Sequence, residues 1–295
     1  MPRSSVLLCA AAVSAQQISI TVRNEMDEDA QLFWVNAQQQ PTAVGVVAGF
    51  GGELKQQTHV GHKFRFRGVD GAGNEFTIRG DRETYSLTRS GKVRVECVVS
   101  GGKYAAGARG QLGLTVYPDW SPRGAGRFLA LVRRGIFNGV AINRVKEQFL
   151  AQFGIAPVYE HRTKWRSKTM KDDPPQNIPF KAGYVAFAGS GPDSRSTEMF
   201  LVMPDAPPHQ LAAFGTNPWE TPFAVADDVA VKEVLPKLIN DYGDMPPWGN
   251  GPDPHRIYAK GGYTYLADNF PELAYFETCR VVEKPMPAVA RGADL

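Results

Sequence analysis

The sequence predicts a mainly β protein made of two domains, and three observations support this prediction. Its 295 residues, 43% of them apolar, are enough for two separate hydrophobic cores. Residues 17–99 alternate polar and apolar side chains with the period of a β-strand. Two later stretches, residues 139–154 and 183–202, consist of short strand-like segments rich in Val, Ile and Phe and separated by turn residues.

The N-terminus has the pattern of a secretory signal peptide. A Pro-Arg pair is followed by the apolar run Val6–Val13 and by small residues, which predicts cleavage after Ala15. The run is too short to span a bilayer, and no later segment approaches that length. The alternative is an ordinary apolar N-terminus of a cytosolic protein. We expect a leader at residues 1–15 and a secreted protein or one of the secretory-pathway lumen.

Residues 16–99 are predicted to form a small β-sandwich. Five short runs with strand periodicity are separated by Asp, Gly, Gln and Asn turns, and no helical window competes with them. The segment VDGAGNE between two of the runs indicates a hairpin. The runs are ISITVRN, AQLFWVN, KFRFRGV, NEFTIRG and VRVECVV.

This domain resembles the von Hippel–Lindau tumour-suppressor β domain over about residues 17–90. Asn24, the LFWV motif at Leu32–Val35, Asn36 and TxxGHxF at Thr58–Phe64 carry the resemblance.

The resemblance implies a candidate hydroxyproline-type site. The family recognises hydroxyproline with Ser, His, Trp and Tyr side chains; Thr58 and His62 match the first two, and Phe64 stands where the Trp would be. The segment expected to carry the Tyr, TAVGVV, contains none. Together with Trp34, these residues form the candidate site. The alternative role for His62 is a structural hydrogen bond.

Two cysteines remain after cleavage of the leader, because Cys9 would leave with it. Cys97 and Cys279 both lie in strand-like segments. An oxidising compartment would permit one bridge between them, whereas two buried free thiols would behave as small hydrophobic side chains. The sequence permits both alternatives and favours the free thiols.

Residues 100–110, SGGKYAAGARG, are predicted to be a linker, because Gly, Ser and Ala offer no packing face. A second domain is expected at residues 111–283, followed by a tail at 284–295. Within it, residues 127–137 have the pattern of an amphipathic helix. A second helix is expected at 227–242, kinked by its proline, Pro236.

The second domain also contains a long basic segment. Residues 159–179 are first rich in Lys and Arg and then in Asp and Pro, which predicts a surface loop whose charged residues form a solvated face.

The stretch Val140–Gly154 contains one cation, Arg144, among strand-forming apolar residues. A buried guanidinium must stay hydrogen-bonded, because an unpaired buried charge is costly. Arg144 is therefore either paired with a nearby carboxylate at the rim of a barrel or a fixed donor directed into a pocket floored by Phe149.

A resemblance to the cyclophilin family of peptidyl-prolyl isomerases favours the second interpretation. The motifs NRVxxxFLAQxG and GYVAFAGSGPDSRSTEMF carry it, and a third block at Tyr242–Val282 resembles the C-terminus of one cyclophilin subgroup. The resemblance covers about residues 111–282. It implies a closed eight-stranded β-barrel capped by two helices, with a proline-binding groove on its outer face.

The resemblance assigns roles residue by residue. It implies that Arg144 is the donor, that Phe149 and Phe200 are the walls of the proline slot, and that Gln152 makes a backbone contact. The other expected substrate-binding residues are Leu150, Ala188, Gly189, Glu198 and Leu211. A glutamate at 198 introduces a charge beside Arg144, and a direct pair would divert the arginine from substrate.

Other functions have little support in the composition. The net charge of +3, from 33 basic and 30 acidic side chains, gives no electrostatic case for nucleic acid. The five histidines and two mature cysteines show no spacing typical of a metal site. We expect a monomer without cofactor or metal that isomerises prolyl bonds in proline-containing clients. The alternatives are a module that binds proline peptides without turnover and a purely structural use of both folds.

Overall fold

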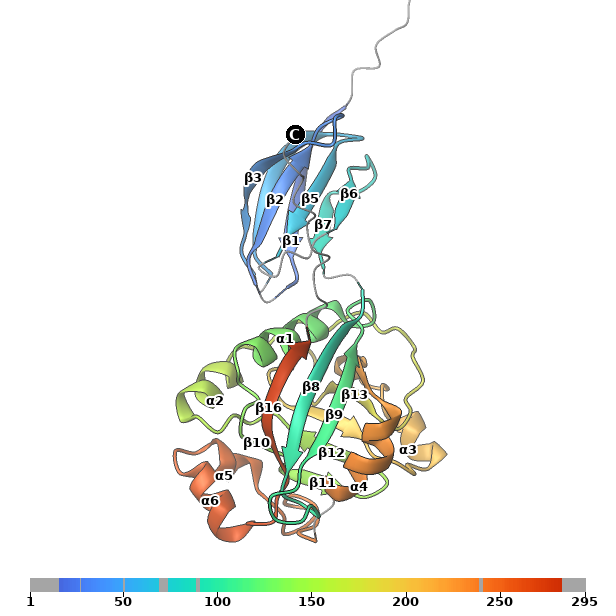
Figure 1. The fold of residues 1–295 in the computed structure, drawn as a ribbon. Helices are drawn as coiled ribbons and strands as arrows, with labels where there is room; N and C mark the ends of the chain where they lie inside the picture. Colours follow the sequence, from blue (N-terminus) through green and yellow to red (C-terminus); the bar gives the residue numbers. More distant parts are fainter. Residues whose placement is uncertain are drawn as a thin grey trace, which may run out of the picture. The chain divides into compact units, whose positions relative to one another are not determined.

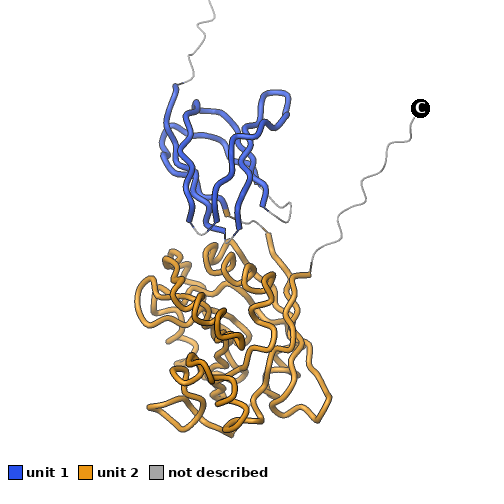
Figure 2. Tube along the Cα trace, turned by 90° about the vertical axis from the view of Figure 1, so that its left-hand side faces the viewer, with its two compact units in different colours: residues 1–87 blue, residues 88–295 orange. Residues whose placement is uncertain are grey.

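The structure is a computed structural model that describes residues 16–26, 28–49, 51–68, 74–88, 91–238 and 241–282. The chain divides into two compact units, residues 1–87 and 88–295 (Figure 2). The expected leader at 1–15, which includes Cys9, and the expected tail at 284–295 lie outside the described residues.

The first unit consists of two small antiparallel-rich sheets around one buried cluster. One sheet has the order β4-β1-β7 and the other β3-β2-β5-β6. Alternate residues of the strands point inward, as the period-2 pattern predicts, and Val22, Leu32 and Leu87 are fully buried. The strands are β1 (Gln17–Asn24), β2 (Ala30–Val35), β3 (Pro41–Val47), β4 (Glu53–His59), β5 (Lys63–Arg67), β6 (Glu75–Thr77) and β7 (Thr84–Leu87).

The second unit is built on a curled nine-stranded sheet (Figure 1). Its order is β10-β16-β8-β9-β15-β13-β14-β12-β11, so β10 and β11 are the two edges, and no ladder joins them in the described part of the chain. The observed arrangement therefore differs from the expected closed barrel of eight strands. The strands are β8 (Val93–Ser100), β9 (Gly110–Val116), β10 (Val140–Ala141), β11 (Arg144–Lys146), β12 (Leu150–Phe153), β13 (Tyr184–Phe187), β14 (Met199–Val202), β15 (Ala224–Ala226) and β16 (Tyr275–Val282).

The boundary between the units differs from the predicted one at residue 99. Strand β8 belongs to the second unit, where it pairs with β9 on one side and with β16 on the other. Val95 and Val99 are fully buried in the core of that unit. The predicted linker at 100–110 is the connection between β8 and β9 within one sheet. Strand periodicity alone cannot assign a strand to a sheet, because the partner strand β16 is distant in sequence.

Helices are more numerous than the two expected. The helix predicted at 127–137 is α1 (Pro122–Arg133), which begins earlier because Pro122 occupies its first turn. The first eight residues of the predicted basic loop form α2 (Tyr159–Arg166). Arg162 of α2 is buried and donates to the carbonyl oxygens of Pro157 and Ala259, which ties this helix to the C-terminal part of the unit.

The remaining helices lie in the C-terminal half of the unit. Near Pro236 the chain forms the π-helical segment η2 (Ala230–Val234) followed by α4 (Leu235–Leu238). The Leu235 N–H bonds to the Ala230 oxygen, five residues back, which agrees with the helix irregularity expected beside a proline. The others are α3 (Pro208–Ala213), η1 (Pro218–Glu220), α5 (Pro254–Tyr258) and α6 (Gly262–Asn269).

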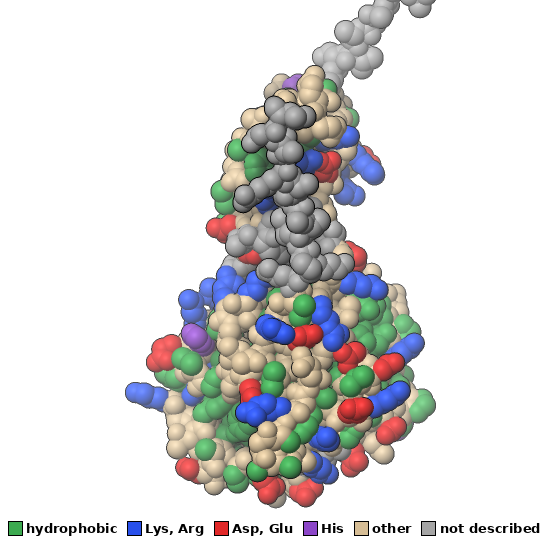
Figure 3. All heavy atoms as spheres, in the orientation of Figure 1, with side chains coloured by type: hydrophobic (Ala, Val, Ile, Leu, Met, Phe, Trp, Pro, Cys, Tyr) green, Lys and Arg blue, Asp and Glu red, His purple; other side chains and the backbone are tan. Residues whose placement is uncertain are grey.

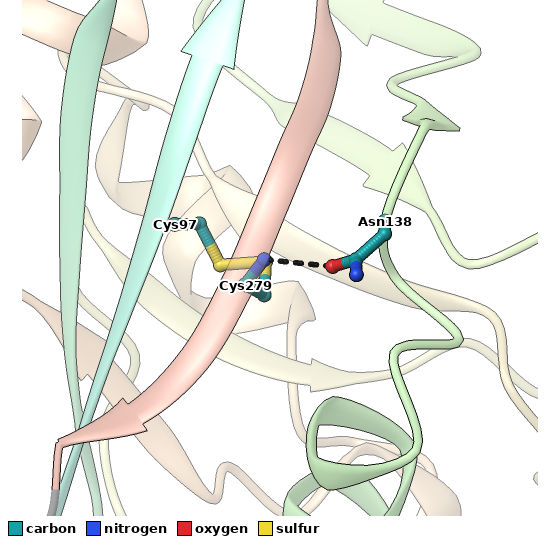
Figure 4. The surroundings of a disulfide bond; sticks show 3 residues. All are labelled: Cys97, Asn138 and Cys279. Atoms are coloured by element: carbon teal, nitrogen blue, oxygen red, sulfur yellow. Dashed lines mark hydrogen bonds between the residues drawn. A yellow bond between two sulfur atoms is a disulfide. The ribbon is translucent and has the colours of Figure 1, made fainter.

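Cys97 and Cys279 form a disulfide (Figure 4). The two residues face each other in the β8–β16 ladder, with their Cα atoms 4.1 Å apart. The Cys279 N–H donates to Asn138 Oδ1 at 3.1 Å. Of the two alternatives that the sequence permits, the structure contains the bridge rather than the favoured free thiols.

The surface of the second unit carries both signs of charge. On the face shown in Figure 3, Lys and Arg side chains alternate with Asp and Glu side chains rather than gathering by sign. No helix among the described residues is long and apolar enough to cross a membrane. In the same part of the chain, no group of three or more His, Cys, Asp or Glu side chains is placed to hold a metal ion.

Candidate active site

Three adjacent strands place the predicted catalytic side chains next to one another. Arg144 of β11 lies opposite Gln152 of β12, and Gln152 lies opposite Phe200 of β14. Residues directly opposite in a ladder project from the same face of a sheet, so these side chains share one face. Phe149 comes from the turn between β11 and β12, where Gln148 adopts a φ of 56°.

The four side chains line one groove with a volume of about 340 Å³. Three of the predicted substrate-binding residues, Leu150, Ala188 and Gly189, line it as well. Leu211 does not; it packs instead against the apolar cluster behind the groove. Glu198 lines a neighbouring cavity rather than this one. The rest of the lining is Gln210, Ala213, Phe214, Glu220 and Met245.

The floor of the groove is aromatic. The Phe214 ring stacks on Phe149 and on Phe200, with centroid distances of 5.2 and 5.0 Å. Phe180 lies 5.5 Å from Phe214 behind them. Phe200 is buried, whereas Phe149 is half-buried. The arrangement forms an apolar slot that suits a small hydrophobic ring.

Packing explains why position 189 is a glycine. A Cβ built at this position would lie 2.7 Å from Trp219 Cδ1, which is closer than carbon atoms approach. The absence of a side chain therefore lets Trp219 of η1 pack against the backbone of the groove edge.

Arg144 is held by a carboxylate that the sequence did not single out. Its Nε donates to Asp244 Oδ1 at 2.6 Å and its Nη2 to Asp244 Oδ2 at 3.3 Å. Its Nη1 donates to Gln152 Oε1 at 3.2 Å. A guanidinium has five N–H groups, so two remain without a partner among the described residues. Arg144 and Glu198, for which the sequence left a direct pair open, are instead bridged by the Gln152 amide.

The pair with Arg144 determines the protonation of Asp244. Burial by itself would raise the pKa of this carboxyl, but the hydrogen bond and charge of Arg144 lower it, assisted by the Met245 N–H and the charge of Lys146. The net pKa lies below the ordinary value, so Asp244 is an anion at neutral pH. The cation and its carboxylate are both largely shielded from water, with side chains 12% and 10% exposed.

Glu198 completes a hydrogen-bonded chain that starts at Arg144. Gln152 Nε2 donates to Glu198 Oε2 at 2.9 Å, and the Tyr258 hydroxyl donates to Oε1 at 2.9 Å. The two bonds of Gln152 determine which way its amide points, with the oxygen toward Arg144. Burial raises the pKa of Glu198 above its ordinary value, although both hydrogen bonds oppose this shift.

A family comparison identifies the part of the chain that carries the predicted catalytic residues. Residues 103–216 match the family model described as cyclophilin type peptidyl-prolyl cis-trans isomerase/CLD. Arg144, Phe149, Gln152 and Phe200 all lie in the matched segment. Residues 103–216 are a cyclophilin-type domain.

Curated proteins with partial matches include two with isomerase names. A candidate bifunctional phosphatase/peptidyl-prolyl cis-trans isomerase of Streptococcus pyogenes serotype M6 is 22% identical over 125 residues, which cover 40% of this chain and 25% of that protein. Peptidyl-prolyl cis-trans isomerase CYP65 of Arabidopsis thaliana is 30% identical over 100 residues, covering 33% of this chain and 17% of that protein. The matches thus span a quarter or less of these relatives.

Among solved structures, a cyclophilin-type peptidyl-prolyl cis-trans isomerase of Cryptosporidium parvum is similar to this chain. The match has a TM-score of 0.44 and 12% sequence identity, and it covers 66% of this chain and all of that one.

Two members of the hydrogen-bonded network around Arg144 lie outside the matched segment. Asp244 comes from the loop after α4, and Tyr258 ends α5. Asp244 is 100 residues from Arg144 in sequence, and it is one acidic residue in a Gly/Pro-rich segment. No local pattern marks it as the partner. Phe214 lies inside the matched segment, so the sequence held a signal for this residue.

Glu198→Gln is expected to stabilise the cyclophilin-type domain at neutral and alkaline pH. A carboxyl whose pKa is raised by folding favours the folded state only while it is protonated, and this contribution is lost as the pH rises through the folded pKa. Glutamine keeps the side-chain size without the desolvated charge. Thermal unfolding should give a melting temperature a few degrees higher than wild type at pH 8, with the difference vanishing below pH 4.5. A melting temperature lower than that of the wild type at pH 8 would contradict the raised pKa of Glu198.

The first unit brings together three of the four residues of its candidate site. Thr58 Oγ1 and His62 Nδ1 lie 3.0 Å apart, and the His62 and Trp34 rings are 5.5 Å apart. Phe64 differs from the expected cage residue, because it is 1% exposed and stacks on Phe76 in the core. Burial, followed by the charge of His59, lowers the pKa of His62. The imidazole is therefore neutral at pH 7, as its hydrogen bond to the Thr58 hydroxyl allows.

Proposed function

We propose that this chain is a peptidyl-prolyl cis-trans isomerase that acts on proline-containing protein clients. The observation that carries the proposal is the position of Arg144, a fixed cationic donor, above an apolar slot floored by Phe149, Phe200 and Phe214. The match of residues 103–216 to the cyclophilin-type family supports it.

Prolyl isomerisation requires no proton transfer from the protein. Rotation about an X–Pro bond is opposed by amide resonance, with a barrier of about 18–20 kcal/mol. At the transition state the twisted amide has lost that resonance, so the lone pair is localised on a pyramidal nitrogen that accepts a hydrogen bond better than the planar nitrogen does. A pre-organised donor that bonds to this twisted form lowers the barrier without any proton transfer.

Each group of the groove has a part in this mechanism. The aromatic slot holds the pyrrolidine ring, and two N–H groups of Arg144 remain for the substrate amide. Asp244 and Gln152 hold the other edge of the planar guanidinium, so the donors need no reorientation during the reaction. Gln152 is in turn held by Glu198.

We place this activity in the secretory pathway or outside the cell. The Cys97–Cys279 bridge supports an oxidising compartment, since disulfides are rare in the cytosol. The signal-like N-terminus agrees with this location. We also propose that the first unit is a von Hippel–Lindau-like β-sandwich that binds the same client through Thr58, His62 and Trp34.

A second candidate function is a proline-peptide binding module without turnover. The contact between Arg144 and Asp244 favours this candidate, because a carboxylate at 2.6 Å neutralises much of the charge that would act on the amide. The apolar slot would still bind a proline ring.

The proposed function is tested by prolyl exchange in a short peptide, followed by NMR, with the intact chain and with Phe149→Ala. The wild type should accelerate exchange above the uncatalysed rate. The variant should raise KM roughly tenfold or more, because it removes an aromatic wall worth about 1.5–3 kcal/mol. Phe33→Ala, at a half-buried phenylalanine of the first unit, is the matched control and should leave the rate unchanged.

The outcomes separate the two candidates. Peptide binding that falls with Phe149→Ala, without any acceleration by the wild type, would support the binding module. Absence of both binding and acceleration would make both candidates wrong.

A further inference from the structure

A second cavity opens beside the proline groove. Its volume is about 650 Å³, nearly twice that of the groove. The two share four lining residues, so a chain that binds in one can extend into the other. The shared residues are Gln152, Ala188, Gly189 and Met245.

The far wall of this cavity comes from segments distant in sequence. Trp248, 68% exposed, forms one side together with Pro246 and Pro247. Arg166, in the last turn of α2, and His255 of α5 line the cavity as well. The Arg166 guanidinium carbon lies 4.2 Å from the centre of the Tyr258 ring, which holds the cation at the cavity.

Hydrogen-bond donors predominate in the lining. Arg166 forms no salt bridge with a described residue and acts on Glu198 only through its charge. The N–H donors of its guanidinium therefore remain for a ligand. Four hydroxyl-bearing residues line the same cavity, of which Ser194 already donates to the Gly191 oxygen. The one carboxylate in the lining, Glu198, accepts from Gln152 and Tyr258. The hydroxyl-bearing residues are Thr169, Ser190, Ser194 and Ser196.

We infer that this cavity binds an acidic side chain close to the client's proline, with Arg166 as the residue that determines this specificity. The inference rests on the proposed function, because the proline ring of the same client would occupy the adjoining groove. Carboxylate and phosphate groups both accept several hydrogen bonds from a guanidinium and from hydroxyls. A glutamate, an aspartate or a phosphoserine would therefore all meet the chemistry of the site.

A basic residue fits the cavity less well. A lysine would bring a second cation toward Arg166 and would have to compete for Glu198 oxygens that Gln152 and Tyr258 occupy. A neutral glutamine would keep the hydrogen bonds but lose the charge interaction. The expected order of affinity is glutamate, then glutamine, then lysine.

The test compares proline peptides that differ only at one, two or three residues on either side of the proline. Each position carries glutamate, phosphoserine, glutamine or lysine in turn, and affinity is measured from the fluorescence of the intact chain. At one position, glutamate should bind roughly three- to tenfold more tightly than glutamine, with the ratio falling as salt is added. Phosphoserine at the same position shows whether the doubly charged group is preferred.

Two variants assign the preference to the cavity. Arg166→Gln should reduce the glutamate-to-glutamine ratio to about one, while the affinity of the glutamine peptide stays the same. Lys164→Gln is the matched control, because Lys164 lies on the same helix but not in the cavity lining. It should keep the wild-type ratio.

The readout is affinity, so it separates this inference from the proposed catalysis. Peptides that bind with the charge preference but are not isomerised would support the inference and contradict the enzyme. Peptides that are isomerised with equal affinity for glutamate and glutamine would overturn the inference alone. A preference for lysine, an unchanged ratio in Arg166→Gln, or no binding of any peptide would overturn it as well.

Discussion

Replacing Arg144 with alanine is expected to lower kcat/KM for prolyl isomerisation by about 10²–10³-fold, the loss typical when one pre-organised donor is removed. The pyramidal nitrogen accepts the hydrogen bond from Arg144 only in the twisted amide, so the loss should be in kcat while KM changes little. Arg144→Lys should recover only part of the rate, because an ammonium group cannot bond to Asp244, Gln152 and the substrate with the geometry of a planar fork. Steady-state exchange rates measured by NMR over a range of peptide concentrations provide both parameters.

The design must separate catalysis from folding. Arg144→Ala leaves Asp244 as a buried carboxylate without its cation, which is destabilising. The double variant Arg144→Ala/Asp244→Asn removes both charges and should show the same loss of rate with a smaller loss of stability. Arg280→Ala is the control, because that side chain is 75% exposed and pairs with Glu96. An unchanged rate in the double variant would contradict a catalytic role for Arg144 and leave the binding module.

Removing the Cys97–Cys279 bridge is expected to be the largest single loss of stability. The bridge joins residues separated by 182 positions, and cross-links of long loops contribute about 2–5 kcal/mol by restricting the unfolded chain. The double variant Cys97→Ala/Cys279→Ala should therefore melt roughly 5–15 °C lower than wild type. Calorimetry of the intact chain, with and without a thiol reductant, measures the shift.

The reductant provides the internal control for this prediction. It should lower the melting temperature of the wild type toward that of the double variant and leave the variant itself unchanged. Intact-mass measurement after alkylation should detect no free thiol in the wild type at these two positions. Two alkylated cysteines in the untreated protein would show that the bridge is not formed in solution.

Strand periodicity predicted four of the seven strands of the first unit, β1, β2, β5 and β6, and missed β3, β4 and β7. The resemblance to a known family supplied the residues of the groove. The period-2 alternation in residues 17–99 predicts which side chains are buried, because a strand places successive side chains on opposite faces. The spacing of Arg144, Phe149 and Gln152 follows from one hairpin, so a short motif contains the information. The ladder between β12 and β14 adds Phe200, and the four side chains line one groove.

Features that depend on distant partners were not predictable in this way. Strand β8 has the same periodicity as its neighbours in sequence, yet it pairs with β9 and β16 in the second unit. The number of strands in the curled sheet likewise depends on packing against other elements. The same holds for α2, which the first eight residues of the basic segment form. Sequence periodicity describes one strand or helix at a time and carries no information about which other elements pack against it.

The sequence by itself determined that two β-rich regions follow one another and that one of them carries an arginine above a set of phenylalanines. Only the tertiary structure decided what that arginine touches. The chain returns after 100 residues to place Asp244 on Arg144, and Gln152 separates the arginine from Glu198. Electrostatic interactions depend on distances in space, and distances between residues far apart in the chain are set by the packing of the whole unit.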